Sequence, residues 1–237
     1  MKLYKSNEPN TFYYVTLVTH NRVPVFRADK ACEIFMDVLR ETREKYPYKL
    51  IGYVLMPDHV HAIVNNRSGT ISDWLRRVRG NSARKILAWL REGQHLTSLA
   101  KLALSHPQKR QHTHAIWQKD PSVIDLWSGR FVRQKLNYLH LNPVRAELCR
   151  HPAEWKWSSY RAYLPHAPGE APIEMDRRAY WEESELTIES PNPDLGNPDP
   201  RLETPDLCLE ASYRPPANPD EKPAGQQTAF KKGTGGR

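Results

Sequence analysis

The sequence predicts an α+β domain followed by a C-terminal segment of different character. Segments rich in aromatic and β-branched residues alternate along residues 12–141 with segments whose apolar residues recur at helical spacing. Beyond Leu164 this alternation ends, and the last 73 residues hold 12 of the 20 prolines. We therefore predict one folded domain over residues 1–164 and a Pro-rich acidic tail over residues 165–237 that is disordered.

Charge divides the chain at the same place. Residues 1–164 hold 27 basic and 13 acidic side chains, a net charge of +14, whereas residues 165–237 hold 8 and 14, a net charge of −6. A basic domain of this kind suits a polyanionic partner, although a basic soluble domain without such a partner fits equally well.

The cysteines and the apolar runs limit the class of protein. Cys32, Cys149 and Cys208 are far apart and show no C-x-x-C spacing, so we expect neither a disulfide framework nor a zinc-thiolate site. The sequence shows no apolar leader and no run of membrane-spanning length. We expect no membrane partner and a cytoplasmic location.

A strand and a helix are predicted first. Residues 12–19, FYYVTLVT, alternate in the manner of a central strand, with Tyr14 and Thr16 on one face and Val15 and Leu17 on the other. Asp29 is placed to cap a helix over residues 30–46, which Pro47 ends.

Two histidines lie at the centre of the next segment. In KLIGYVLMPDHVHAIVN, residues 49–65, two strand-like runs flank the turn residues Pro57 and Asp58. His59 and His61 are two apart on the second strand, so both side chains point to one face, about 6.6 Å apart. Imidazole is the commonest metal ligand, and two imidazoles leave open positions on a divalent ion. An exposed or merely packed pair is the alternative.

A long amphipathic helix is predicted over residues 71–92. Thr70 and Asp73 form a capping-box pattern, Trp74 and Val78 belong to a packing stripe, and another side is basic. That basic side is either a polyanion contact or simply a solvated face. After it we predict an irregular linker over residues 93–113, a short edge strand over 114–118 and a loop over 121–127.

Another helix, over residues 130–141, concentrates chemically useful side chains. Gln134, Tyr138 and Asn142 recur every four residues on one face, away from a stripe of leucine and valine. Pro143 predicts that the helix ends there, or that it restarts with Asn142 as a plain N-cap. Tyr138 could equally be a half-buried aromatic. The Trp-rich segment that follows contains two rival nucleophiles, Tyr160 and Tyr163.

Four motifs together resemble one family. YVLMPDHVHAIV at 53–64, Trp117-Gln118, KLNYLHLNPVRAEL at 135–148 and WSSYRAY at 157–163 resemble the REP-associated tyrosine transposases, a branch of the single-tyrosine HUH transposases. The resemblance covers residues 11–163. It implies a ferredoxin-like or RRM-like antiparallel sheet flanked by helices, a divalent metal, Mg²⁺ or Mn²⁺, held by His59, His61 and Asn142, and Tyr138 as the nucleophile.

The resemblance also implies a substrate. Single-stranded DNA with a REP-type hairpin would be cut through a 5′-phosphotyrosine intermediate by a monomer or homodimer at the nucleoid of a prokaryote. Two alternatives stay open: a protein that binds hairpin DNA without cutting it, and a metal-dependent hydrolase that uses water. Candidate contacts to the DNA backbone are the basic residues Arg76, Arg77, Arg79, Arg84, Lys85, Arg130 and Arg133.

Overall fold

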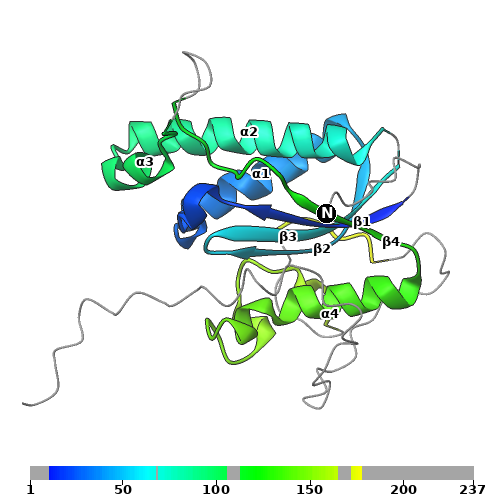
Figure 1. Cartoon of the computed structure of the whole chain (residues 1–237). Helices are drawn as coiled ribbons and strands as arrows, with labels where there is room; N and C mark the ends of the chain where they lie inside the picture. The colour runs from blue at the N-terminus through cyan, green and yellow to red at the C-terminus, as the bar shows by residue number, and fades with distance from the viewer. Residues whose placement is uncertain (1–10, 68, 106–112, 165–171, 178–237) are drawn as a thin grey trace, which may run out of the picture. The chain divides into compact units, whose positions relative to one another are not determined.

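A four-stranded antiparallel sheet forms the centre of the molecule. The computed structural model describes residues 11–67, 69–105, 113–164 and 172–177. Its strands run in the order β2-β3-β1-β4, and every neighbouring pair is antiparallel. The predicted α+β class and antiparallel sheet are confirmed (Figure 1). The strands are β1 (Phe12–Val18), β2 (Tyr48–Met56), β3 (His59–Asn66) and β4 (Ser122–Leu126).

Helices cover both faces of this sheet. Helices α1 and α2 lie on one face and α4 on the other (Figure 1). The chain order of strands and the first two helices, with this strand order, gives the ferredoxin-like arrangement, to which α4 adds a layer. The helices are α1 (Asp29–Lys45), α2 (Ile71–Glu92), α3 (Leu96–Leu102) and α4 (Gly129–Arg145); short 3-10 turns are η1 (His20–Arg22), η2 (Val25–Arg27), η3 (Pro152–Glu154) and η4 (Tyr160–Tyr163).

Strand β1 separates the main core from the α4 side of the sheet. Tyr13, Val15 and Leu17 are buried in the core that also takes the apolar stripes of α1 and α2. Successive side chains on a strand point to opposite faces, so Tyr14 and Thr16 face α4. The alternation predicted from the sequence therefore sets which β1 side chains can reach the histidines.

Helix α4 is seated on β2 through a glycine. A β-bulge interrupts the pairing of β2 with β3 between Leu50 and Gly52. A Cβ atom added at Gly52 would lie only 2.5 Å from the Leu136 Cδ1 atom, so the absence of a side chain here lets the helix approach the strand. The Ser128 side chain caps α4 by accepting a hydrogen bond from the Phe131 backbone N–H.

Four predicted boundaries need correction. Residues 93–113 were expected to be irregular, yet α3 forms there, and β4 forms in the expected loop at 121–127. Over 114–118 only isolated bridges occur, Thr19 with Trp117 and Ala103 with His114, because the edge position beside β1 belongs to β4. The fourth correction concerns Asp29, which does not cap α1. It lies inside the helix, and its carboxylate accepts hydrogen bonds from side chains at 156 and 157.

Helix α4 also continues where the sequence predicts a break. Pro143 lies within the helix, which runs to Arg145. The Ala146 N–H donates to the Asn142 carbonyl, so the last turn closes although proline provides no N–H of its own. Asn142 is thus an interior helical residue rather than an N-cap.

Residues 172–177 pack against the domain. Ile173 is buried in the core, and the Asp176 carboxylate accepts from the Leu50 N–H and pairs with Arg43. The described start of the predicted tail is therefore docked, whereas the remainder, including Tyr180 and Trp181, lies outside the described residues. Within the described ranges, no helix combines the length and apolar character needed to cross a bilayer.

A buried histidine of α4 predicts a pH dependence of stability. The His140 Nε2 lies 2.8 Å from the Ser159 hydroxyl, and burial lowers the pKa of His140 to about 3. The unfolded chain, with a histidine pKa of about 6.5, takes up this proton first as the pH falls. The contribution of neutral His140 to the free energy of unfolding is therefore fully present above about pH 6.5. It declines as the pH falls toward 3, by at most about 1.4 kcal/mol per pH unit.

Urea unfolding at several pH values measures this dependence. His140→Gln should show a shallower decline in the free energy of unfolding than the wild type over that range, since glutamine does not titrate. Identical slopes for the two proteins would contradict the prediction.

Candidate metal and nucleophile site

The turn between β2 and β3 brings two imidazoles together. Met56 pairs with His59 at the start of β3, and Thr16 of β1 pairs with His61 two residues later. The centres of the two histidine rings are 4.8 Å apart. His61 is buried and His59 is partly exposed, so the pair has one enclosed and one accessible member.

One nitrogen of each ring is already engaged. The His59 Nδ1 lies 2.6 Å from the Asp58 carboxylate, and the His61 Nδ1 lies 3.0 Å from the Thr16 hydroxyl. This leaves Nε2 as the ligand atom on both rings. The His61 Nε2 is buried and has no hydrogen-bond partner among the described residues. Metal-binding histidines have this pattern, because an oxygen on the far nitrogen fixes the tautomer and the ring orientation.

Asp58 is itself held from two sides. The Arg22 guanidinium donates to its carboxylate at 2.8 Å, and the Thr19 hydroxyl donates to its backbone carbonyl at 2.8 Å. Burial opposes ionisation of Asp58, but the hydrogen bonds and charges of His59 and Arg22 outweigh it and hold the pKa below its usual value. The carboxylate is therefore charged and fixed at neutral pH.

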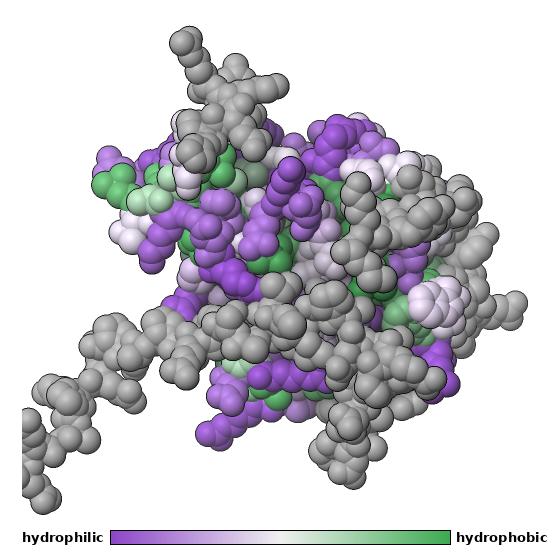
Figure 2. All heavy atoms as spheres, viewed as in Figure 1, coloured by the Kyte–Doolittle hydropathy of each residue, from purple (hydrophilic) through white to green (hydrophobic). Residues whose placement is uncertain are grey.

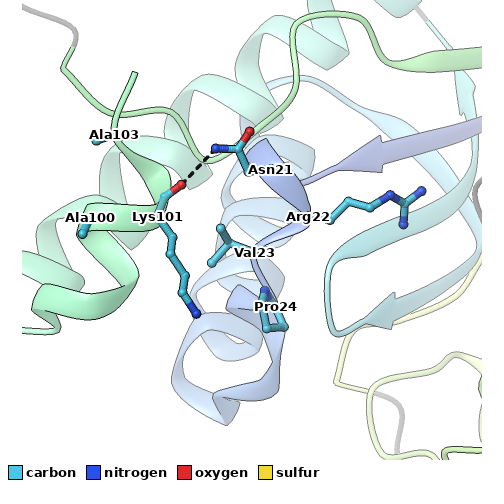
Figure 3. Close-up of a pocket in the computed structure, with 7 residues that line it drawn as sticks. All are labelled: Asn21, Arg22, Val23, Pro24, Ala100, Lys101 and Ala103. Atoms are coloured by element: carbon cyan, nitrogen blue, oxygen red, sulfur yellow. Dashed lines mark hydrogen bonds between the residues drawn. The ribbon is translucent and has the colours of Figure 1, made fainter. Parts of the chain in front are cut away.

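Arg22 reaches Asp58 from a turn with unusual backbone geometry. Asn21 and Arg22 have φ values of 52° and 50°, in the left-handed region. The Asn21 side chain donates to the Lys101 carbonyl across a pocket of about 440 Å³ between η1 and α3, while the Arg22 side chain points away from α3 toward the β2–β3 hairpin (Figure 3). The residues lining this pocket do not include either histidine.

Asp58 should therefore control the affinity of the histidine pair for a metal. We expect Asp58→Ala to weaken Mn²⁺ binding about 10- to 100-fold, the usual cost of losing such a support. Asp58→Asn, which keeps an acceptor oxygen, should lose less. Isothermal titration measures this, with Asp37→Ala as a control because Asp37 pairs with Arg40 on the surface of α1. Unchanged affinity in Asp58→Ala would contradict the assignment.

Tyr138 of α4 lies beside His61, the buried member of this pair. Its ring centre is 6.4 Å from that of His61 and 6.4 Å from that of Tyr14, and Tyr14 stacks on His61 at 5.3 Å. Tyr138 is partly exposed. The structure thus brings together the two histidines and the tyrosine that the sequence places some eighty residues apart.

Two cations flank the Tyr138 ring. The Lys135 Nζ lies 5.5 Å from its centre and 5.1 Å from that of Tyr14, and the Arg145 guanidinium lies 4.7 Å from the Tyr138 ring. Lys135 is only 8% exposed, which is unusual for a lysine. Positive charge in so enclosed a place stabilises an anion such as a phosphodiester.

The same surroundings keep His61 neutral. Burial, with smaller contributions from the charges of His59 and Lys135, lowers the pKa of His61 well below its usual value. A neutral imidazole retains the lone pair that binds a metal, so His61 is competent as a ligand at physiological pH.

Asn142 lies one turn after Tyr138 and is buried. Residues four apart share one side of a helix, and the Asn142 Nδ2 has no hydrogen-bond partner among the described residues. Among the described residues, no group of three or more His, Cys, Asp or Glu side chains could hold a metal ion. The side chains that could do so here are the two imidazoles, joined by the amide of Asn142. Such a set fits a divalent cation that keeps further positions for phosphate oxygens.

The rival tyrosines occupy a different environment. Tyr160 and Tyr163 are buried around His140, with ring centres 5.4 and 5.7 Å from it. The Tyr163 hydroxyl donates to the Ile51 carbonyl, and burial raises the pKa of Tyr160. Tyr138, by contrast, lies beside His61, together with the buried Tyr14 of β1.

The basic residues predicted on α2 do not gather at this site. Helix α2 covers the opposite face of the sheet from α4, and hydrophilic side chains lie over its outer surface (Figures 1 and 2). Several already have partners: Arg76 pairs with Asp73, Arg77 stacks on Tyr46, Arg79 donates to the carbonyls of residues 118 and 119, and Lys85 pairs with Glu41. Arg84 is exposed on the same helix. Among the predicted contacts, Arg130 and Arg133 share α4 with Tyr138, and both are exposed.

Comparisons with known proteins agree with this fold and sequence. Residues 8–101 match the family model described as "Transposase IS200 like". A curated Haemophilus influenzae protein whose name assigns it to the REP-associated tyrosine transposases is 25% identical over 150 residues, which are 62% of this chain and 78% of that protein. A solved structure of a REP-associated tyrosine transposase bound to a REP hairpin matches with a TM-score of 0.53 at 13% identity, covering 80% of this chain and 99% of that one.

Over residues 8–101 the chain is therefore similar to the IS200-like transposases, and it shares its fold with the hairpin-bound structure. The resemblance to the REP-associated tyrosine transposases that the four motifs predict is confirmed.

Proposed function

We propose that this chain is a metal-dependent single-stranded DNA endonuclease and strand transferase. It cuts beside REP-type hairpins and forms a 5′-phosphotyrosine intermediate through Tyr138. The observation that carries the proposal is the meeting of Tyr138 with His61 and Tyr14 between α4 and the sheet. One chain supplies both parts, so a monomer is sufficient for the chemistry.

Three side chains would hold the metal. The Nε2 atoms of His59 and His61 are the nitrogens that Asp58 and Thr16 leave unengaged. The amide oxygen of Asn142 would be the third ligand. Mg²⁺ or Mn²⁺ suits this set, with Mn²⁺ the better match to nitrogen. When bound, the ion would polarise the scissile phosphodiester as a Lewis acid.

The chain's own residues supply the remaining steps. The Tyr138 oxygen attacks phosphorus, the bond to the 3′ oxygen breaks, and the proton lost by the phenol is balanced by the one that the released 3′-hydroxyl gains. Lys135 and Arg145 stabilise the negative charge of the reacting phosphate. The covalent bond conserves the phosphodiester energy, so a second 3′-hydroxyl can reverse the step without ATP.

The substrate assignment has separate support. The relative of known structure that shares this fold is bound to a REP hairpin. Exposed Arg130 and Arg133 on the helix of the nucleophile provide phosphate contacts that position DNA without reading its sequence.

A trapping experiment tests the proposal. The protein is incubated with single-stranded DNA containing REP-type hairpins and Mg²⁺ or Mn²⁺, and a covalent adduct is isolated under denaturing conditions and mapped by peptide sequencing. We expect an adduct on the peptide that contains Tyr138, dependent on the metal. Tight, salt-sensitive hairpin binding without cleavage would instead indicate a binding protein, and cleavage without an adduct would indicate hydrolysis by water.

A further inference from the structure

We propose that Trp127 and Phe131 form a stacking platform for a base of the DNA single strand that leads to Tyr138. This inference extends the proposed function and rests on it, because the path of the DNA strand toward Tyr138 follows from the proposed reaction. The binding surface itself is defined by contacts within the structure. Nothing in the motif resemblance involves Trp127, which immediately follows β4.

Trp127 is an exposed aromatic held in a fixed place. It is 74% exposed, more than any other large hydrophobic residue in the described part of the chain. Its ring centre lies 4.5 Å from that of Phe131, which is itself only 6% exposed and belongs to the first turn of α4. The two ring planes are tilted by 48° to each other, so Phe131 contacts one side of the indole, while most of the Trp127 surface stays open to a flat partner.

The platform continues directly into the candidate site. The Lys135 Nζ lies 5.8 Å from the Phe131 ring centre and 5.5 Å from that of Tyr138. Residues 131, 135 and 138 recur along one side of α4, and seven residues of helix span about 10.5 Å.

Charge decides the kind of partner. The Lys135 Nζ lies between the platform and Tyr138, and Arg130 and Arg133 are exposed on the same helix. Proteins that bind single-stranded nucleic acids with little sequence preference combine exposed aromatic rings with nearby cations. This works for any sequence because every base has a π-face and every nucleotide has a phosphate. A protein partner would gain little from the cations, whereas single-stranded DNA uses both features.

Binding measurements without cleavage test the platform. The full chain, in EDTA, is titrated into labelled oligo(dT) of about 12 nucleotides, a length within the range that single-strand grooves accommodate, and into a blunt hairpin without a single-stranded flank. We expect Trp127→Ala to weaken binding of oligo(dT) about 5- to 100-fold and to leave the blunt hairpin unaffected. Trp127→Phe should restore most of the affinity.

The controls separate this inference from a loss of structure and from the proposed function. Leu96→Ala removes a comparably exposed side chain, 72% exposed on α3, and should change neither affinity. The platform would be overturned if wild type and Trp127→Ala bound oligo(dT) equally well, or if the variant lost the same affinity for both DNAs. It would also be overturned if the wild type did not measurably bind oligo(dT), or if light scattering showed that Trp127→Ala changes dimerisation instead of DNA binding. A protein that forms no Tyr138 adduct but shows the Trp127 effect would refute the proposed function alone.

Discussion

Tyr138→Phe should abolish the covalent protein–DNA adduct and reduce strand cleavage by more than about a thousandfold, the scale seen when a nucleophile is removed. Only the hydroxyl is lost, and the ring keeps its contacts with His61, Tyr14 and Arg145. The fold and hairpin affinity should therefore change little. Denaturing gels with labelled hairpin DNA measure the adduct, and thermal unfolding shows that the variant is folded.

Tyr160→Phe is the matched control for this change. It removes a hydroxyl from a tyrosine of the following motif, at 157–163, whose ring lies beside His140. The adduct should form at the wild-type rate. If Tyr138→Phe still cleaves DNA, the nucleophile is water or another side chain, and the strand-transfer proposal is wrong.

His61→Ala should remove both Mn²⁺ binding and cleavage while sparing most of the hairpin affinity. The change deletes the enclosed imidazole, leaving His59 and Asn142 as an incomplete ligand set. Cleavage should fall by more than about a hundredfold, since the metal contributes several kcal/mol of charge stabilisation. Isothermal titration with Mn²⁺ and fluorescence anisotropy with labelled hairpin DNA measure the two properties separately.

His114→Ala provides the comparison for His61→Ala. His114 is partly exposed and lies at the bridge to Ala103, near α3. Metal binding and cleavage should both persist in this variant. A loss of hairpin affinity in His61→Ala as large as its loss of cleavage would show that His61 holds the fold or the DNA rather than a metal.

Local patterns were sufficient to predict the main elements of the site. The alternation around Pro57 predicted that His59 and His61 share a face, and the four-residue spacing predicted that Tyr138 and Asn142 share a helix side. Periods of 2 and 3.6 residues involve side chains only two to four positions apart in the sequence, so these patterns can be recognised without knowledge of the tertiary fold. The Thr70 and Asp73 capping pattern was confirmed for the same reason.

The rest of the site depends on contacts between distant segments. Thr16 reaches His61 only because β1 pairs with β3, and Lys135 reaches Tyr14 only because α4 packs on the sheet. The one local signal for Lys135 was its position three residues before Tyr138, whereas the sequence grouped Gln134 with that tyrosine. Strand β4 was missed because Val123 and Ile124 gain their partners from β1.

The close contact at Gly52 has a consequence for how the reaction centre is built. Tyr138, the proposed nucleophile, lies two residues beyond Leu136, whose side chain occupies the space that a side chain at position 52 of β2 would need. A helix is stiff over so short a distance, so the absence of a side chain at Gly52 sets how closely Tyr138 approaches the sheet. The distance between Tyr138 and His61 thus depends on a position outside the candidate site.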